Sequence, residues 1–164
     1  MWAVAACILA AATPAVAGPE AAIARQKSLD GVYLHLGPAL GVGDSDAGVD
    51  TFAGGAVSLT RLREGDLLGV IGGRISAARW TEREAGRIDA DLVVGTRRLG
   101  FLAGVAAGPI LDISGDHHPR IGGSARIWCY AGVVPYVRVG VLAASGRFIE
   151  AGLELPLPVW RWRR

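Results

Sequence analysis

The stretch Arg-Phe-Ile-Glu-Ala-Gly-Leu-Glu-Leu-Pro-Leu-Pro-Val, residues 147–159, decides how this chain folds. Its apolar residues fall on every second position starting at Ile149, and Glu150 and Glu154 fall between them. A period of two is typical of a β-strand with one apolar and one polar face. In a helix both glutamates would lie on one face with leucines close by, so the pattern argues against a helix. The stretch therefore predicts a strand.

The same alternation recurs in two other segments, residues 87–97 and 135–142. In the first, Asp89 and Asp91 alternate with apolar residues, and in the second Arg138 lies between valines. Five further segments are apolar, rich in glycine and bounded by polar residues, namely 31–41, 51–61, 67–79, 100–111 and 121–131. Together these segments predict eight antiparallel strands.

The composition indicates where such strands would lie. The chain has 164 residues, which fits one domain, and its mean hydropathy is +0.36. The longest apolar run after the N-terminus, residues 99–111, is shorter than the roughly 20 residues of a membrane helix, whereas a membrane strand needs only about 9–11. The net charge of +2, without a basic stripe, argues against nucleic acid as a partner. We predict an all-β fold, a closed antiparallel eight-stranded transmembrane up-and-down β-barrel.

The N-terminus has the pattern of an export signal. Residues 1–17 carry no charge, contain a run of small apolar residues and end in Ala15-Val16-Ala17, a typical cleavage motif. We predict a signal peptide over 1–17, a periplasmic segment over 18–28 and the barrel over 29–164. Cys7 would leave with the signal, so Cys129 would be the one remaining cysteine and no internal disulfide could form.

The links between the predicted strands alternate in length. Longer polar links follow the odd-numbered strands, at residues 42–50, 80–86, 112–120 and 144–146, and shorter links follow the even-numbered strands, at 62–66, 98–99 and 132–134. Long loops on one side and short turns on the other are typical of an outer-membrane barrel, whose long loops face out of the cell. The link lengths therefore predict the orientation of the barrel as well as its location.

Aromatic residues cluster near the ends of the predicted strands. Bilayer barrels carry a girdle of aromatic side chains at each interface. We therefore predict interfacial positions for six of them, namely Trp80, Phe101, Trp128, Tyr136, Trp160 and Trp162.

Charged residues in the middle of the strands share the parity opposite to the apolar face. If Leu92, Val94, Val139, Val141, Leu153 and Leu155 face lipid, the lumen must hold an ionic network of Arg74, Asp89, Asp91, Arg126, Arg138, Glu150 and Glu154. We predict pairs of Arg138 with Glu150 or Glu154, from a register that sets Arg138 opposite Gly152, and of Arg74 with Asp91 or Asp89. An eight-stranded barrel is just wide enough for its side chains to fill, so the network predicts a plugged lumen and not a wide pore.

In strand count, link pattern and inferred polar interior, the chain resembles the small eight-stranded outer-membrane β-barrels, the OmpX-like and OmpA-transmembrane-domain-like proteins. The most specific local feature is Glu150-x-Gly152-x-x-Leu155-x-Leu157, which is similar to the signal by which the barrel-assembly machinery recognises a last strand. The resemblance implies a monomer in the cell outer membrane, with lipid, lipopolysaccharide and that machinery as partners. Pro156 and Pro158 depart from the family pattern, and we expect the chain from Pro156 onward to leave the sheet.

Two other functions stay open at this point. A lipid A-modifying hydrolase would need a serine within about 2.6–3.2 Å of a histidine, and His35 is the one histidine outside a predicted loop. A soluble exported barrel that binds a small apolar ligand would need the face of Val139 inside and that of Arg138 outside. The sequence singles out no catalytic residue, no metal site and no cofactor, and we favour a structural or surface-interaction role.

Overall fold

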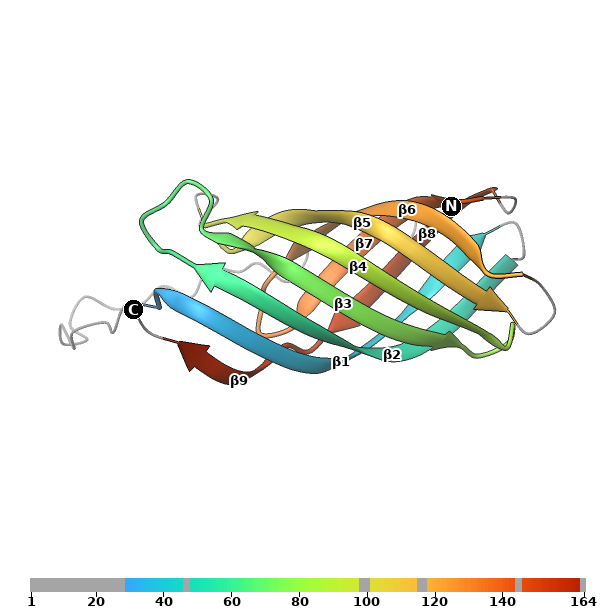
Figure 1. Ribbon diagram of the computed structural model, residues 1–164, viewed down its shortest axis with the longest axis horizontal. Helices are drawn as coiled ribbons and strands as arrows, with labels where there is room; N and C mark the ends of the chain where they lie inside the picture. The colour runs from blue at the N-terminus through green and yellow to red at the C-terminus, as the bar shows by residue number, and fades with distance from the viewer. Residues whose placement is uncertain (1–28, 46–47, 98–100, 115–117, 144–145, 163–164) are drawn as a thin grey trace.

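The structure, a computed structural model, describes residues 29–45, 48–97, 101–114, 118–143 and 146–162. The predicted signal peptide 1–17 and the segment 18–28 lie outside the described residues. The described chain forms nine strands (Figure 1): β1 (Gly31–Ser45), β2 (Gly48–Leu62), β3 (Val70–Trp80), β4 (Ala85–Thr96), β5 (Ala103–Ser114), β6 (Arg120–Cys129), β7 (Val134–Leu142), β8 (Gly146–Glu154) and β9 (Leu157–Trp162).

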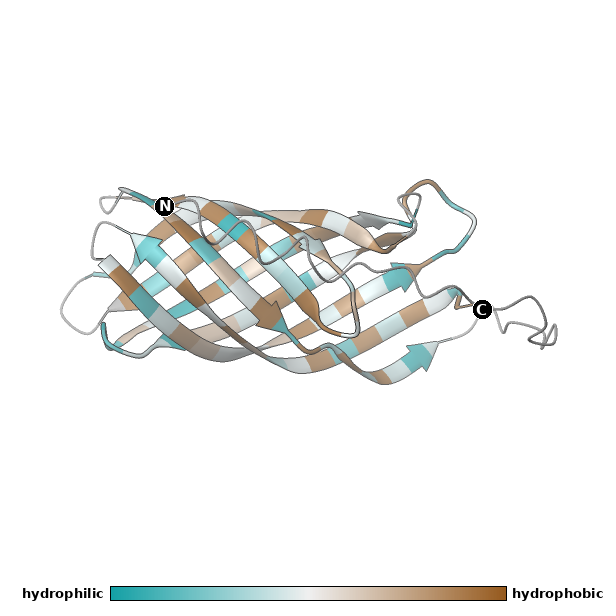
Figure 2. Ribbon diagram, turned by 180° about the vertical axis from the view of Figure 1, so that it is seen from behind, coloured by the Kyte–Doolittle hydropathy of each residue, from teal (hydrophilic) through white to brown (hydrophobic). Residues whose placement is uncertain are grey.

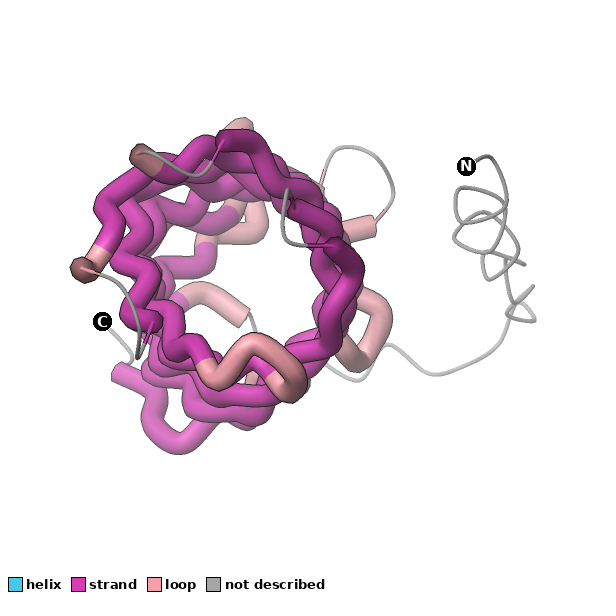
Figure 3. Tube along the Cα trace, turned by 90° about the vertical axis from the view of Figure 1, so that its right-hand side faces the viewer, coloured by secondary structure: helices cyan, strands magenta, loops and turns pink. Residues whose placement is uncertain are grey.

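The strands close into a barrel. Each strand from β1 to β8 pairs antiparallel with the next, and β1 also pairs with β8, so the sheet has no free edge there. Seen end-on, the strands form a complete ring (Figure 3). Within the described residues, no helix is of a length and apolarity that could cross a membrane. The predicted all-β, eight-stranded antiparallel barrel is confirmed.

The final strand of the barrel is built from two segments, β8 and β9. The second half of β1, from Ala39 to Ser45, pairs with β8. Its first half pairs with β9, with a register shift between Leu34 and His35. The expectation that the chain leaves the sheet at Pro156 is therefore wrong. The two prolines interrupt the ladder only locally, because Leu155 N donates to Pro38 O at 3.0 Å just before them and pairing resumes at Leu157.

The links between strands do not follow the predicted asymmetry. β1 and β2 run through the predicted long loop 42–50, and only residues 46–47 separate them. Residues 63–69, between β2 and β3, form a longer link at the other end. The alternation simply continues into the acidic stretch, because Val49 is exposed and Asp50 is buried. The predicted loop 42–50 is therefore wrong, because an aspartate at a strand end can point into the lumen, as Asp50 does.

The two ends of the barrel are named here by their strands. The hairpin end is where β1 meets β2, at Ser45 and Gly48, and the terminal end is where β1 begins at Gly31 and β9 finishes at Trp162 (Figure 1). A glycine with φ of +85°, Gly132, lies in the tight β6–β7 turn at the terminal end, where a left-handed backbone favours glycine.

Side chains alternate between the lumen and the outer surface. Val139 is 51% exposed, whereas its neighbour Arg138 is 3% exposed. Hydrophobic and hydrophilic positions accordingly alternate along the strands (Figure 2). The other apolar residues predicted to face outward are exposed or, for Val94, half-buried. These residues are Leu92, Val94, Val141, Leu153 and Leu155. This arrangement is the reverse of the one that a soluble apolar-ligand barrel requires, so that alternative is wrong in its stated geometry.

Candidate functional site

Charged side chains fill the middle of the lumen. The seven residues predicted for the interior are each no more than 6% exposed: Arg74, Asp89, Asp91, Arg126, Arg138, Glu150 and Glu154. They project from β3, β4, β6, β7 and β8. Buried charges are costly unless they are paired, so the geometry of their contacts decides what the lumen can do.

Asp89 is the centre of this network. Both of its carboxylate oxygens accept hydrogen bonds from Arg138, at 3.0 Å from Nη1 and 3.0 Å from Nη2. Arg74 Nη1 donates to Oδ1 at 2.6 Å, and Ser76 Oγ donates to Oδ2 at 2.5 Å. A two-pronged guanidinium–carboxylate contact is among the strongest pairings that proteins make, so Asp89 ties β3, β4 and β7 together through the lumen.

A second cluster lies around Glu154. Its Oε2 accepts hydrogen bonds from Arg74 Nε at 2.9 Å and from Arg126 Nη1 at 3.3 Å. Arg126 Nε lies 3.8 Å from Asp91 Oδ2, while Asp91 also accepts from Arg74 and Arg138, each at 3.2 Å. One glutamate is thus shared by two arginines.

The predicted ion pair of Arg138 with Glu150 forms, but the predicted register is wrong. Arg138 lies opposite Glu150, not Gly152, and its Nη1 is 3.8 Å from Glu150 Oε2, while no contact with Glu154 is among those formed by the described residues. The strong contact is with Asp89, which lies on β4. Strands β4 and β7 are not neighbours in the sheet, but the curvature of a closed barrel brings their inward side chains together across the lumen. The pairing register of neighbouring strands therefore cannot predict the contact between Arg138 and Asp89.

Two buried groups that were not predicted extend the network toward the hairpin end. Arg87 Nη2 donates to Asp112 Oδ2 at 3.1 Å, and Arg87 also contacts Glu150. Asp112 Oδ1 lies 3.5 Å from Arg120 Nη2. A sequence signal for Arg87 did exist, because it has the same parity as Asp89.

Asp50 is a third buried group that the sequence did not predict, and it connects two strand links at the hairpin end. Its carboxylate accepts hydrogen bonds from the backbone N–H groups of Thr51 at 2.7 Å, Glu82 at 3.2 Å and Arg83 at 3.1 Å. Arg83 Nε adds a contact at 3.4 Å. Asp50 therefore joins the start of β2 to the β3–β4 turn.

Three of the six aromatics predicted at the membrane interfaces lie inside the barrel. Trp80, Trp128 and Tyr136 are only 2%, 8% and 5% exposed. Their parity explains the error, since Trp80 shares its face with Arg74, Trp128 with Arg126, and Tyr136 with Arg138. The other three, Phe101, Trp160 and Trp162, are exposed at the terminal end.

Five of the inward aromatic rings lie over glycines. A Cβ on Gly152 would come within 2.7 Å of the Tyr136 ring, and a Cβ on Gly140 would come within 2.3 Å of Phe148. Both glycines are direct cross-strand partners of those rings. The same relation holds for Phe52 over Gly41 and Trp128 over Gly104, while Trp80 lies over Gly43, two strands away. Glycine therefore provides the space that lets large rings lie flat within a narrow lumen.

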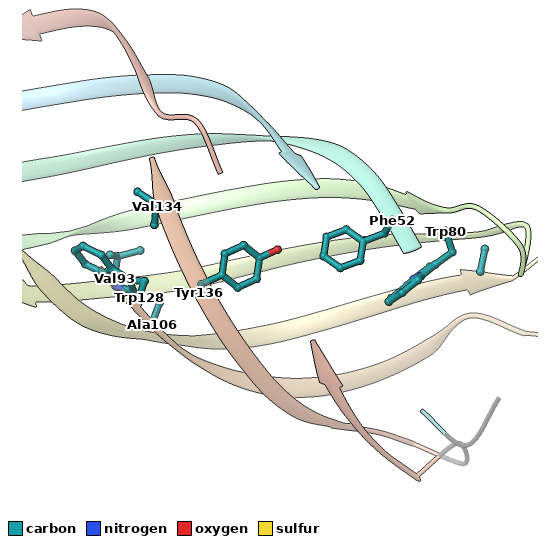
Figure 4. Close-up of a cluster of buried hydrophobic side chains, with 8 residues drawn as sticks. Phe52, Trp80, Val93, Ala106, Trp128, Val134 and Tyr136 are labelled. Carbon is teal, nitrogen blue, oxygen red and sulfur yellow. The ribbon is translucent and has the colours of Figure 1, made fainter. Parts of the chain in front are cut away.

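Aromatic rings and guanidinium groups contact each other within the lumen. Figure 4 shows Trp128, Tyr136, Phe52 and Trp80 in a row from the terminal end toward the hairpin end. The guanidinium carbon of Arg87 lies 5.0 Å from the centre of the Trp80 ring and 4.5 Å from that of Phe148. Cation–π contacts of this kind strengthen when water is excluded, so rings and charges form one packed unit.

The packed unit ends before the terminal end, where the lumen opens into a cavity of about 470 Å³. Its floor is formed by Arg74, Arg126 and Glu154, and Trp128 and His35 stand in its walls. Toward the hairpin end, a space of only about 10 Å³ lies between the side chains, which is room for about one water molecule. The cavity is therefore closed on the side of the network.

Comparison with protein families, curated proteins and solved structures finds no match to this chain. Function must therefore be argued from the geometry alone.

Among the serines and histidines that the structure describes, one pair in the cavity wall lies close together. Ser58 Oγ is 3.5 Å from His35 Nδ1, because the two residues are cross-strand partners on β1 and β2. The distance exceeds the 2.6–3.2 Å that a serine and its base require. Among the described residues no carboxylate hydrogen-bonds the His35 ring. Nor do three His, Cys, Asp or Glu side chains of those residues gather into a group that could hold a metal ion.

Proposed function

We propose that the protein spans the outer membrane as a sealed barrel that conducts no ions, with a structural or surface-interaction role. The single observation that carries the proposal is the apolar outer surface. Exposed aliphatic side chains occur on every strand, and examples are Leu40, Val57, Ile75, Leu92 and Val105. Exposed apolar surface this continuous marks an interaction with membrane or with another protein.

The positions of the outward charges support a bilayer in particular. Asp44, Arg61, Arg79 and Arg147 are exposed on the strands, and each lies one residue from the end of its strand. The outer surface between them carries the apolar band that a bilayer core requires, because charged substitutions cost least near the interfaces. A soluble protein would have no reason to confine outward charges to the strand ends.

The orientation follows from the ends of the barrel. We place the terminal end in the periplasm, because an exported chain that crosses the membrane eight times starts and finishes on the same side. Phe101, Tyr130, Trp160 and Trp162 are exposed at this end, where a girdle of aromatics would meet the interface. The barrel-assembly machinery would recognise the segment of Glu150, Gly152, Leu155 and Leu157 from the periplasmic side. Lipid and lipopolysaccharide would surround the apolar band on the outer surface.

The charge network supports the sealed state. Asp89, Arg74 and Arg138 bridge the lumen with contacts of 2.6 to 3.0 Å. A permeating ion would have to separate these pairs in a poorly solvated interior. Removing one member of such a pair leaves a buried charge without its partner, which is strongly unfavourable.

The test is to produce the full chain in a Gram-negative host, fractionate the envelope and insert the purified protein into planar bilayers. We expect recovery with the outer membrane, heat-dependent gel migration and no steady conductance. Recovery in the soluble fraction would contradict the membrane proposal, and steady conductance of the inserted protein would contradict the sealed lumen. The location and the conductance are measured separately, so the membrane proposal and the sealed lumen can each be refuted without the other.

A further inference from the structure

We infer that the cavity at the terminal end is a binding site for a small amphipathic carboxylate, with its charged group on the arginine floor and its apolar part against the walls. The inference goes beyond the proposed function, and only the access from the periplasm rests on it. A volume of about 470 Å³ lies within the range of small-molecule sites.

The floor supplies positive charge and hydrogen-bond donors that are not in use. Arg74 and Arg126 are 3% and 5% exposed, and both line the cavity. Arg74 uses Nε and Nη1 for its contacts, and Arg126 uses Nη1, so that the Nη2 group of each donates to no described residue. Among the described residues, Glu154 is the one carboxylate that lines the cavity, and it is shared by both arginines. A second carboxylate would engage the two remaining donor groups, in the pairing that guanidinium prefers.

A third arginine adds to the positive charge of the cavity. Arg97 lines the cavity nearer its mouth, where its partly exposed side chain pairs with Glu64 at 3.1 Å. The charged groups among the described lining residues are therefore three arginines and one glutamate. A cleft in which one sign of charge predominates between apolar walls concentrates ions of the opposite sign, so this excess of arginines favours an anion over a cation.

The walls are divided into a polar and an apolar part. On β1 and β2, Tyr33 lies opposite Thr60, and His35 lies opposite Ser58. Other wall positions are apolar, with Val70, Val93, Leu102, Val134, Pro156 and Pro158 among them. A ligand without an apolar part would leave these walls in contact with water, and a ligand without charge would leave the floor donors unused.

The decisive probe is naphthoate, titrated into the full chain in non-ionic detergent with the tryptophans labelled with ¹⁵N. The indole N–H signal of Trp128, which lines the cavity, is assigned by its loss in Trp128→Phe. We expect this signal to shift saturably while that of Trp80, packed in the filled half of the lumen, stays unchanged. No shift at Trp128, or equal shifts of both signals, would overturn the inference.

Two further ligands define the chemistry. Naphthamide has the same apolar part without the charge, and inorganic phosphate has charge without an apolar part. Both should bind at least tenfold more weakly than naphthoate. Equal binding of naphthamide would refute the role of the arginine floor, and equal binding of phosphate would refute the role of the walls.

Variants locate the site. Arg126→Gln should weaken naphthoate binding at least tenfold, whereas Arg120→Gln, the same change outside the cavity, should leave it unaltered. Val93→Phe keeps the floor and fills the cavity, so it should abolish binding even if Arg126→Gln does not fold. Unaltered binding by folded Val93→Phe would overturn the assignment. Conductance is measured on the same samples. A barrel that conducts no ions and binds no naphthoate would refute the binding site but not the proposed function.

Discussion

The two halves of the lumen share one backbone pattern but differ in content. In the half toward the hairpin end, Trp80 and Phe148 contact Arg87, Phe52 packs edge-on against Trp80, and a space of only about 10 Å³ is left. In the half toward the terminal end, inward positions carry smaller groups such as Ser58 and Thr60, and a cavity of about 470 Å³ remains. Alternation therefore decides which side chains point inward, and their size decides whether the lumen is filled. Three substitutions test this difference.

The largest effect is expected from Arg138→Ala, which removes the arginine that engages both oxygens of Asp89. Asp89 would keep Arg74 and Ser76, but Asp91 would also lose a contact, so the free energy of unfolding should fall by about 3–5 kcal/mol. Urea titration followed by heat-dependent gel migration measures it. Arg147→Ala, on the exposed face of β8, should change stability by less than about 0.5 kcal/mol. Equal effects of the two changes would refute the network.

A matched pair of serines compares the two halves directly. Ser76→Val in the filled half removes the hydrogen bond to Asp89 at 2.5 Å, and should cost about 1.5–3 kcal/mol, as expected for hydrogen bonds to charged groups. Ser58→Val in the open half loses only the 3.5 Å contact with His35 and faces the cavity, so it should cost less than about 1 kcal/mol. The same urea titration reports both. If Ser58→Val proves the more costly, the halves do not differ as described.

The smallest of the three effects concerns the glycines under the rings. Gly140→Ala would place a Cβ within 2.3 Å of Phe148, and overpacking of this kind costs about 1–3 kcal/mol. Gly73→Ala is the control, because a Cβ there meets no atom within 4 Å. The difference between the two unfolding midpoints is the measurement. A Gly140→Ala variant as stable as Gly73→Ala would show that the ring can move aside freely.

Much of the fold could be predicted because its signal is local. Alternation in residues 147–159 identifies Glu150 and Glu154 as one face, and the same rule places Arg138 and Val139 on opposite faces. The same rule extends to the strand ends, where it would place Trp80 and Asp50 in the interior, contrary to the predicted interfacial position of Trp80 and the predicted loop 42–50. There, aromatic and acidic residues resembled girdles and loops, although their parity agreed with the interior.

The site was harder to predict because it depends on distances across the lumen. Arg138 and Asp89 lie 49 positions apart and on strands that are not neighbours. Only closure of the barrel, with its particular curvature, brings them into contact. The cavity is harder still, since it depends on the sum of side-chain volumes at one end and not on any motif. A correct register does reveal the contacts between neighbouring strands, such as Arg74 with Asp91, Arg87 with Asp112 and the ring of Tyr136 over Gly152.

The ring-over-glycine arrangement also constrains how such a chain can evolve. Gly140 cannot acquire a side chain while Phe148 occupies the space above it, and losing Phe148 first would leave a void over Gly140. Either change alone is unfavourable, so the two positions are expected to vary together across descendants, as are Tyr136 and Gly152. Paired exchange at these positions would identify distant homologues of this barrel after ordinary sequence similarity has been lost.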